Sequence, residues 1–234
     1  MPGRSKEICY EDLKLRILRM ELEPGVVLEE ASLAAQYALS RTPLREVLQR
    51  LAGQGYVALA GHRGAKVASM DIAVMRTFFQ TAPMVYSSIS RLAAENRKPA
   101  QLDSLQSAQD MFAKCTQAGN AAAAALAKYR FHEIFGDMAH NVYLTASLNR
   151  LLIDHTRLSQ TFYRPKSQED AALIGKASEQ HEELIAAIDA QDAKHAAELT
   201  LQHWDLSRGR MERFVRPDPL PLEAALPKDK TNAV

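Results

Sequence analysis

Arginine side chains recur along one face of a short segment near the start of the chain. Arg41 and Arg45 lie four residues apart and Gln49 follows at the same spacing, so the three side chains share one side of a helix. The other side is apolar, with four residues at the spacing of a buried helical face: Leu44, Val47, Leu48 and Leu51. Guanidinium groups can donate hydrogen bonds to phosphate oxygens and pair bidentately with guanine. The segment therefore predicts a helix that packs on one side and binds nucleic acid on the other.

The flanking residues predict where this helix begins and ends. Ser40 or Thr42 can cap the first turn, and Pro43 is tolerated there because its missing N–H would have no helical partner. Gly53 and Gly55 favour an end to the helix.

The neighbouring segments predict a winged helix-turn-helix. Residues 29–37 have the pattern of a preceding helix, and residues 38–40 have the length of a tight turn. Two strand-like runs, 56–60 and 65–68, are joined by a turn-rich tip at 61–64. An apolar run at 26–28 could add a third strand. In this architecture the second helix enters the major groove of DNA and the wing lies on the backbone or the minor groove.

Charge is concentrated in this region and not in the chain as a whole. The formal net charge is only +1, so bulk attraction to nucleic acid is not expected. Between Arg41 and Lys66, however, five basic residues face Glu46 alone, a local excess of four positive charges. That excess is sufficient for several phosphate contacts and a salt-dependent affinity.

These residues resemble the DNA-binding domain of the GntR family of bacterial transcription regulators. The resemblance covers about residues 7–70 and rests on Pro24-Gly25, Leu28, Leu33-Ala34, Ser40 through Leu48, Arg50-Leu51, Gly55-Tyr56-Val57 and Arg63-Gly64-Ala65. The remainder is similar to the helical effector domain of the FadR-type branch of that family. The resemblance implies DNA contacts from Ser40, Arg41, Thr42, Arg45 and Arg50 on the helix, and from Arg63, Gly64 and Lys66 on the wing. Ala31 stands where the family often has another arginine, so one contact is expected to be missing.

The resemblance also selects three of the seven histidines as metal ligands. His132 follows Phe131 as in the family's metal site, with Asn141 at the expected turn, and His181 and His203 fall on the last two expected helices. Imidazoles from three helices could hold zinc, nickel or manganese and leave positions open for the carboxylate of a ligand. His155 is a pocket candidate without that support, and His140 and His195 are expected to be exposed or structural.

Lys128 departs from the family pattern, which has an aspartate ligand four residues before the first histidine. A lysine there would repel a dication by a few kcal/mol at about 4 Å, even at an effective dielectric near 20. Three outcomes stay open: a metal on three histidines with Lys128 turned away, a metal-free anion pocket, or no ligand. In the second, Lys128 would bind the carboxylate of an acid together with the neutral histidines and Arg157 or Tyr163.

A second departure lies on the first helix of the effector domain. Ala82 and Tyr86 stand where the family often has an arginine and a glutamate. The identity of the effector therefore cannot be carried over.

The expected fold is mainly α: an N-terminal winged helix-turn-helix followed by an all-α helical bundle. We expect a DNA-binding domain at 1–70, a ligand-binding and dimerisation domain at 71–216 and a flexible tail at 217–234. Residues 1–6 are expected to be a loose arm. Helices are expected at about 72–96, 100–117, 121–139, 142–164, 168–191 and 193–215, with Pro83 bending the first of these or delaying its start.

Composition points to the cytoplasm. Cys9 and Cys115 suggest neither a disulfide framework nor a metal motif. No stretch approaches the roughly 18 apolar residues of a membrane span, and residues 1–6 lack the apolar core of a signal peptide.

The expected function is a homodimeric transcription regulator, most simply a repressor, that binds a palindromic operator and responds to a small carboxylate. One alternative is a DNA-binding dimer whose helical domain is purely structural. The other is a metal-dependent enzyme, against which stands the absence of an HExxH pair, a phosphate-binding glycine loop or a histidine–carboxylate pair near a nucleophile. We expect no enzymatic activity.

Overall fold

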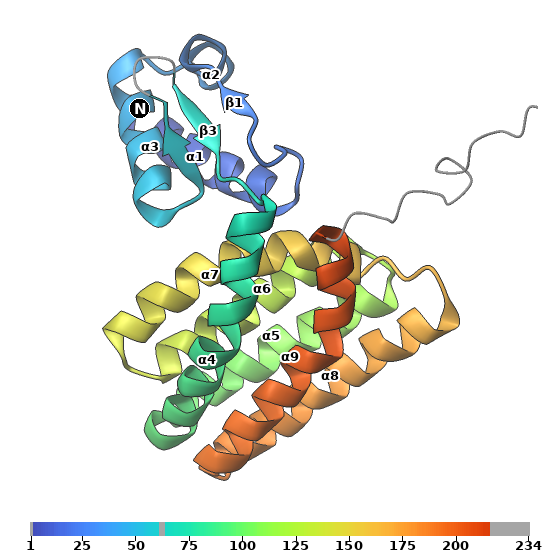
Figure 1. Cartoon of the computed structure of the whole chain (residues 1–234). Coiled ribbons are helices and arrows are strands. Elements are labelled where there is room, and N and C mark those ends of the chain that lie inside the picture. Colours follow the sequence, from blue (N-terminus) through green and yellow to red (C-terminus); the bar gives the residue numbers. More distant parts are fainter. Residues whose placement is uncertain (1, 61–63, 216–234) are drawn as a thin grey trace, which may run out of the picture.

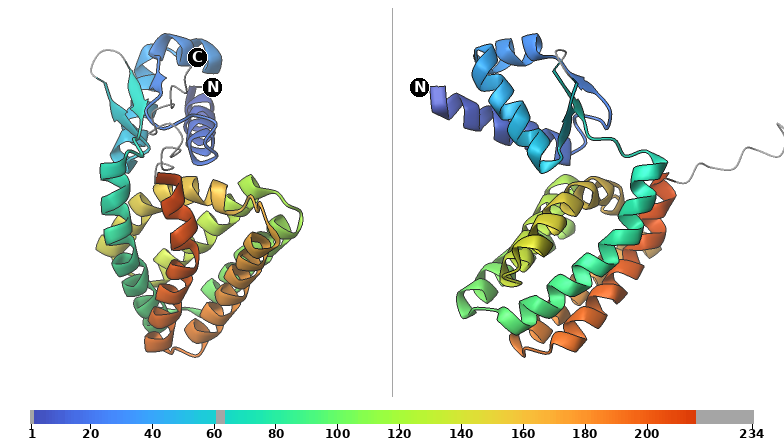
Figure 2. Two further views of the ribbon diagram at one scale, coloured as in Figure 1. Left: turned by 45° about the vertical axis from the view of Figure 1, so that its right-hand side comes forward. Right: turned by 60° about the vertical axis from the view of Figure 1, so that its left-hand side comes forward.

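The structure is a computed structural model that describes residues 2–60 and 64–215. The predicted wing residue Arg63 and the predicted tail at 217–234 lie outside these residues. A small winged domain sits at one end of a helical bundle (Figures 1 and 2). In the described part no helix is long and apolar enough to cross a membrane.

In its described residues, the winged domain contains three helices and a three-stranded antiparallel sheet. Its elements are α1 (Pro2–Leu18), β1 (Val27–Leu28), α2 (Glu30–Tyr37), α3 (Arg41–Gln54), β2 (Val57–Leu59) and β3 (Ala65–Val67). The strand order is β1-β3-β2, with Val27 opposite Lys66 and Val57 opposite Val67. The expected third strand is therefore present. The expectation of a loose arm at residues 1–6 is wrong, because α1 already begins at Pro2.

Six helices follow, as the sequence predicted for this part of the chain. They are α4 (Ile72–Asn96), α5 (Pro99–Gln117), α6 (Ala121–Met138), α7 (Val142–Phe162), α8 (Gln168–Asp189) and α9 (Ala193–Val215). Asp71 caps α4 by accepting a hydrogen bond from the Val74 amide at 2.9 Å. The expectation that Pro83 delays the start of this helix is wrong, because α4 begins at Ile72 and continues through Pro83.

The bundle has its own apolar core, separate from that of the winged domain. α4 packs on α6, α7 and α9, and α5 packs on α6 and α8. Aromatic residues of this core include Phe78, Phe131, Phe135 and Trp204. The core of the winged domain forms around Leu13, Leu44, Leu48 and Leu51.

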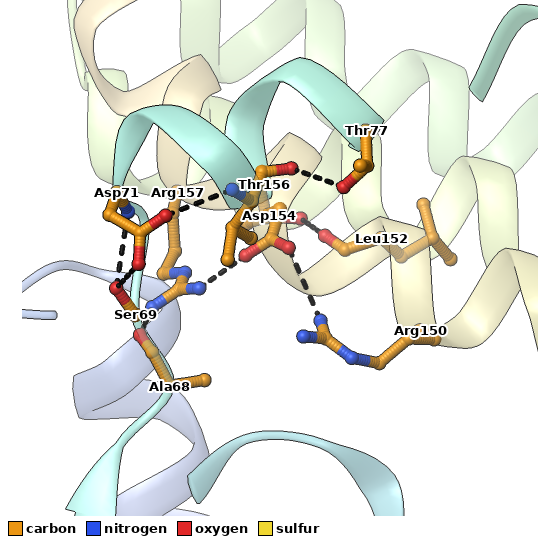
Figure 3. A network of polar contacts seen from close by, with 10 residues as sticks. Ala68, Ser69, Asp71, Thr77, Arg150, Leu152, Asp154, Thr156 and Arg157 are labelled. Atoms are coloured by element: carbon orange, nitrogen blue, oxygen red, sulfur yellow. Dashed lines mark hydrogen bonds and ion pairs between the residues drawn. The ribbon is translucent and has the colours of Figure 1, made fainter. Parts of the chain in front are cut away.

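Helix α7 joins the two domains. Ile153 of α7 is buried in the core of the winged domain, and the Gln160 side-chain amide donates a hydrogen bond to the Leu18 carbonyl at 3.1 Å. Arg157 is fully buried and donates to the Ala68 carbonyl at 2.8 Å (Figure 3). Asp154 pairs with this guanidinium and also accepts a hydrogen bond from Arg150 at 3.2 Å. These contacts fix the linker before α4 against α7.

Candidate functional site

The predicted DNA-reading face of α3 is exposed. Ser40, Arg41, Thr42 and Arg45 are all open to solvent, whereas the leucines and the valine of the opposite face are buried. Ser40 occupies the position before the helix, but its side chain makes no capping hydrogen bond. Gly55, with a φ of 89°, ends the helix as expected. The helix is thus amphipathic in the predicted sense, with its arginines on the outer side.

Arg45 is held in place by an acidic neighbour on α2. Its Nε lies 3.1 Å from both carboxylate oxygens of Glu30, and about half of its side chain stays exposed. The Glu30 side chain is only 16% exposed, so only the Arg45 end of this pair faces solvent. A phosphate or a guanine edge can reach the guanidinium from that side.

Arg50 lies against α1 and has less freedom than Arg45. Its Nη1 donates to Glu7 at 2.8 Å, and its guanidinium carbon stands 3.6 Å from the centre of the Tyr10 ring. Its predicted phosphate contact would require the loss of both interactions.

The described wing residues differ from each other. Lys66 is exposed on β3, whereas Gly64 is buried with a φ of 102°. A Cβ added to Gly64 would lie 2.3 Å from the Leu28 carbonyl oxygen. The backbones of Gly64 and Leu28 approach so closely that only glycine fits at position 64.

Three histidines meet in the bundle core, and they are the three that the family resemblance selected. His132 comes from α6, His181 from α8 and His203 from α9. Each offers one ring nitrogen, and these three atoms lie within 4.8 Å of one another. All three rings are buried.

Hydrogen bonds to glutamines orient two of these rings. The Gln109 amide nitrogen donates to the Ser178 carbonyl at 3.1 Å, so its oxygen must accept the hydrogen bond from His181 Nδ1 at 2.9 Å. Gln180 accepts in the same way from His203 Nδ1 at 3.1 Å. Both Nε2 atoms then carry a lone pair, and both are buried without a hydrogen-bond partner in the described part of the chain. Such partners orient histidine ligands in metal sites.

This donor set fits a divalent metal ion. Burial lowers the pKa of His132, His181 and His203 well below the usual value, and the nearby Lys128 charge acts in the same direction. The rings are therefore neutral at neutral pH, which is the form that binds a metal. Both ring nitrogens of His132 are also buried and unpaired among the described residues.

Lys128 lies beside this histidine cluster, and Tyr163 lies beside Lys128. Lys128 is 3% exposed, and no carboxylate of the described residues forms an ion pair with it, so burial lowers its pKa to about 7. Its Nζ stands 5.7 Å from the centre of the Tyr163 ring. The Tyr163 hydroxyl is buried and unpaired within the described chain.

Arg157, which was expected to bind the effector, instead contacts residues at the domain junction. It lies two positions after His155, about 200° around the helix. Its guanidinium contacts Ala68 and Asp154, at the domain junction.

Sequence reasoning missed the polar residues that surround the histidines. Gln109 and Gln180 carry no motif, and only their helical register places them against the rings. Tyr86, singled out only as a departure from the family pattern, contacts His155 Nδ1 through its hydroxyl at 2.7 Å. His140 and His195 are exposed, within the range that was expected.

Comparisons with known proteins agree with this arrangement. Residues 6–67 match the gntR family of bacterial regulatory proteins, and residues 84–206 match the FCD domain. The chain is 26% identical over 206 residues to the HTH-type transcriptional repressor GlaR of Escherichia coli, covering 83% of this chain and 90% of that protein.

Solved structures share the fold. The Escherichia coli protein McbR/YncC superposes with a TM-score of 0.76 at 19% identity, over 91% of this chain and 99% of that one. A GntR regulator from a Rhodococcus species gives a TM-score of 0.71 at 16% identity, over 92% of this chain and all of that one (100%). The chain belongs to the GntR family of bacterial transcription regulators and carries an FCD domain of the FadR type.

Proposed function

We propose that this regulator is a repressor whose affinity for its operator changes when a small carboxylate binds in the helical domain, through a divalent metal ion held by His132, His181 and His203. One observation carries the proposal: buried imidazole nitrogens from three helices converge without partners in the described chain, in the domain that supports an exposed arginine helix. A related protein named as a repressor supports the direction of the response.

DNA recognition would centre on α3. Arg41 and Arg45 would reach base edges or phosphates in the major groove, with Ser40, Thr42 and Arg50 on the backbone. The wing would add Arg63, Gly64 and Lys66. A DNA-bound bacterial regulator would act in the cytoplasm.

Two copies of the chain would act together. One short helix reads too few base pairs for a specific genomic site, whereas two related by a dyad read a palindrome. Ligand binding would then alter the relative position of the two reading helices.

The histidines would supply three ligands to a zinc, nickel or manganese ion. When bound, such an ion provides a Lewis-acid position for a carboxylate oxygen. Lys128 and Tyr163 would donate hydrogen bonds to the same carboxylate, because Lys128 is buried beside the histidines and the buried Tyr163 lies next to Lys128. Arg157 is assigned to the domain junction instead.

A metal-free anion pocket is the competing version, favoured by the buried Lys128. Metal analysis of the purified wild-type protein and of His181→Ala distinguishes the two. We expect about one metal ion per chain in the wild type and loss of that ion in the variant. A metal-free wild type that still binds short carboxylic acids would support the competing version.

DNA binding is tested by gel shift on the region upstream of the chain's own gene. We expect Arg45→Ala to weaken binding by about 1–3 kcal/mol, the usual contribution of one bidentate base contact. Equal binding by Arg45→Ala and wild type would remove α3 from the reading role. An Arg76→Ala variant, outside the winged domain, is the control.

The two alternatives make different predictions. A purely structural helical domain would show no thermal shift with any acid or metal in a panel. An enzyme would turn over an acid instead of only binding it, and the family and its named relatives argue against that.

A further inference from the structure

A fourth histidine, His155 of α7, lies beside the three proposed ligands. Its ring centre is 5.5 Å from that of His132, and the ring is buried. The chemistry of the ring depends on which nitrogen carries its proton.

Tyr86 determines the position of that proton. Its hydroxyl is buried, and within the described residues its sole hydrogen-bond partner is His155 Nδ1 at 2.7 Å. If Nδ1 donated instead, both the O–H and the Nε2 lone pair would be buried without partners among the described residues, whereas a donating hydroxyl leaves only the Nε2–H unpaired. The hydroxyl therefore donates and Nδ1 accepts. The ring proton is then on Nε2.

His155 thus differs from the proposed metal ligands. The Nδ1 atoms of His181 and His203 face glutamine oxygens, so those rings carry their protons on Nδ1 and present lone pairs at Nε2. The Nε2 atom of His155 instead presents an N–H, which is buried and has no partner in the described chain. A metal ion cannot bind this atom without the loss of its proton, whereas a carboxylate oxygen can accept from it.

We propose that His155 binds the carboxylate of the effector by donating from Nε2, and is not a metal ligand. This role rests on the proposed function. It gives the site a third buried donor beside Lys128 and Tyr163, and it assigns a purpose to Tyr86, which fixes the tautomer. The expected ligands are small organic acids whose carboxylate can accept hydrogen bonds from these donors.

The first experiment measures the tautomer in the wild-type protein. Nitrogen NMR of full-length, histidine-labelled protein, with resonances assigned by single variants, should show a protonated Nε2 and an unprotonated Nδ1 in His155. His181 and His203 should show the reverse. A protonated Nδ1 in His155 overturns the proposal, and this measurement does not depend on a ligand.

The second experiment uses acetate as the probe on zinc-loaded protein. The variant Tyr86→Phe/His155→Phe removes both polar partners together and so leaves no buried hydroxyl unpaired. We expect acetate affinity to fall about 10-fold or more, the effect of losing one hydrogen bond to a charged group, while zinc content is unchanged. Tyr86→Phe alone, which only releases the tautomer, should give a smaller loss.

The possible failures are distinguishable. If the double variant loses zinc, or if its acetate affinity is unchanged, the proposed role of His155 is refuted. The proposed carboxylate site itself is not refuted by either result. Wild-type protein that binds zinc but no acetate refutes the proposed carboxylate site and this role with it.

Discussion

At the scale of single residues, Lys128 departs from the pattern that the family resemblance implies. The family resemblance places an aspartate there, and the structure shows instead a buried amine with no carboxylate paired to it among the described residues. A positive charge in this place opposes both folding and metal binding. It lies beside three neutral imidazoles, an arrangement that fits the proposed role in binding an anion.

The stability of the metal-free protein should depend on Lys128 in a pH-dependent way. Its pKa falls from 10.5 to about 7 on folding, so between these values the unfolded chain binds more protons and stability rises with pH. Lys128→Met should therefore stabilise the protein most near pH 7 and below, and the gain should shrink toward pH 10. The ceiling is about 5 kcal/mol, because one pKa unit corresponds to about 1.4 kcal/mol.

Urea unfolding at pH 7 and pH 9 with a chelator present measures this difference. Lys194→Met is the matched control, since that lysine is exposed on α9. A gain from Lys128→Met that is equal at the two pH values would contradict the burial argument.

Restoring the family residue tests the metal site directly. Lys128→Asp replaces a cation by a carboxylate four residues before His132, on the same face of α6. We expect zinc affinity to rise at least about 10-fold, because one repulsive charge is replaced by an anionic ligand. Competition with a coloured chelator gives the affinity, and Lys128→Met separates loss of repulsion from gain of a ligand.

At the scale of elements, the wing depends on one glycine. Gly64 combines a φ of 102° with a backbone oxygen 2.3 Å from where a Cβ would lie. Gly64→Ala should therefore destabilise the winged domain by about 2 kcal/mol or more, since backbone must move. Thermal unfolding gives the value.

Gly53 is the matched control on α3. Nothing lies within 4 Å of a Cβ added there, and its backbone is helical. Gly53→Ala should stabilise the protein by about 0.5–1 kcal/mol. A similar effect of the two substitutions would show that the contact between Gly64 and Leu28 does not form.

At the scale of the whole molecule, α7 connects the histidine cluster to the winged domain. Its inner face places His155 beside the histidine cluster, while Arg157 and Gln160 hold the linker and the end of α1. A ligand that moves α7 would therefore move the winged domain with it.

Arg157→Lys should reduce this coupling and leave ligand binding intact. A lysine can still pair with Asp154, but it lacks the fork that reaches the Ala68 carbonyl at the same time. We expect the ligand-induced change in operator affinity, typically about 5- to 150-fold in such systems, to fall toward unity. Gel shifts with and without the acid measure it, and unchanged coupling would place the connection elsewhere.

The sequence by itself determined most of the elements and the identity of the family, but it did not predict that α1 begins at Pro2. The amphipathic α3, the wing strands and the six bundle helices follow from local spacing and end signals, which depend only on near neighbours along the chain. The three histidines were selected by resemblance, since no spacing along one helix brings α6, α8 and α9 together.

Only the tertiary structure decided the environment of each functional side chain. Gln109 and Gln180 contact the rings of His181 and His203, Tyr86 contacts His155 Nδ1, and Arg157 belongs to the domain junction. These contacts join residues 23 to 89 positions apart. Burial, partner and proton position are properties of packing between helices, and the order of residues in one helix does not specify which side chains of another will face it.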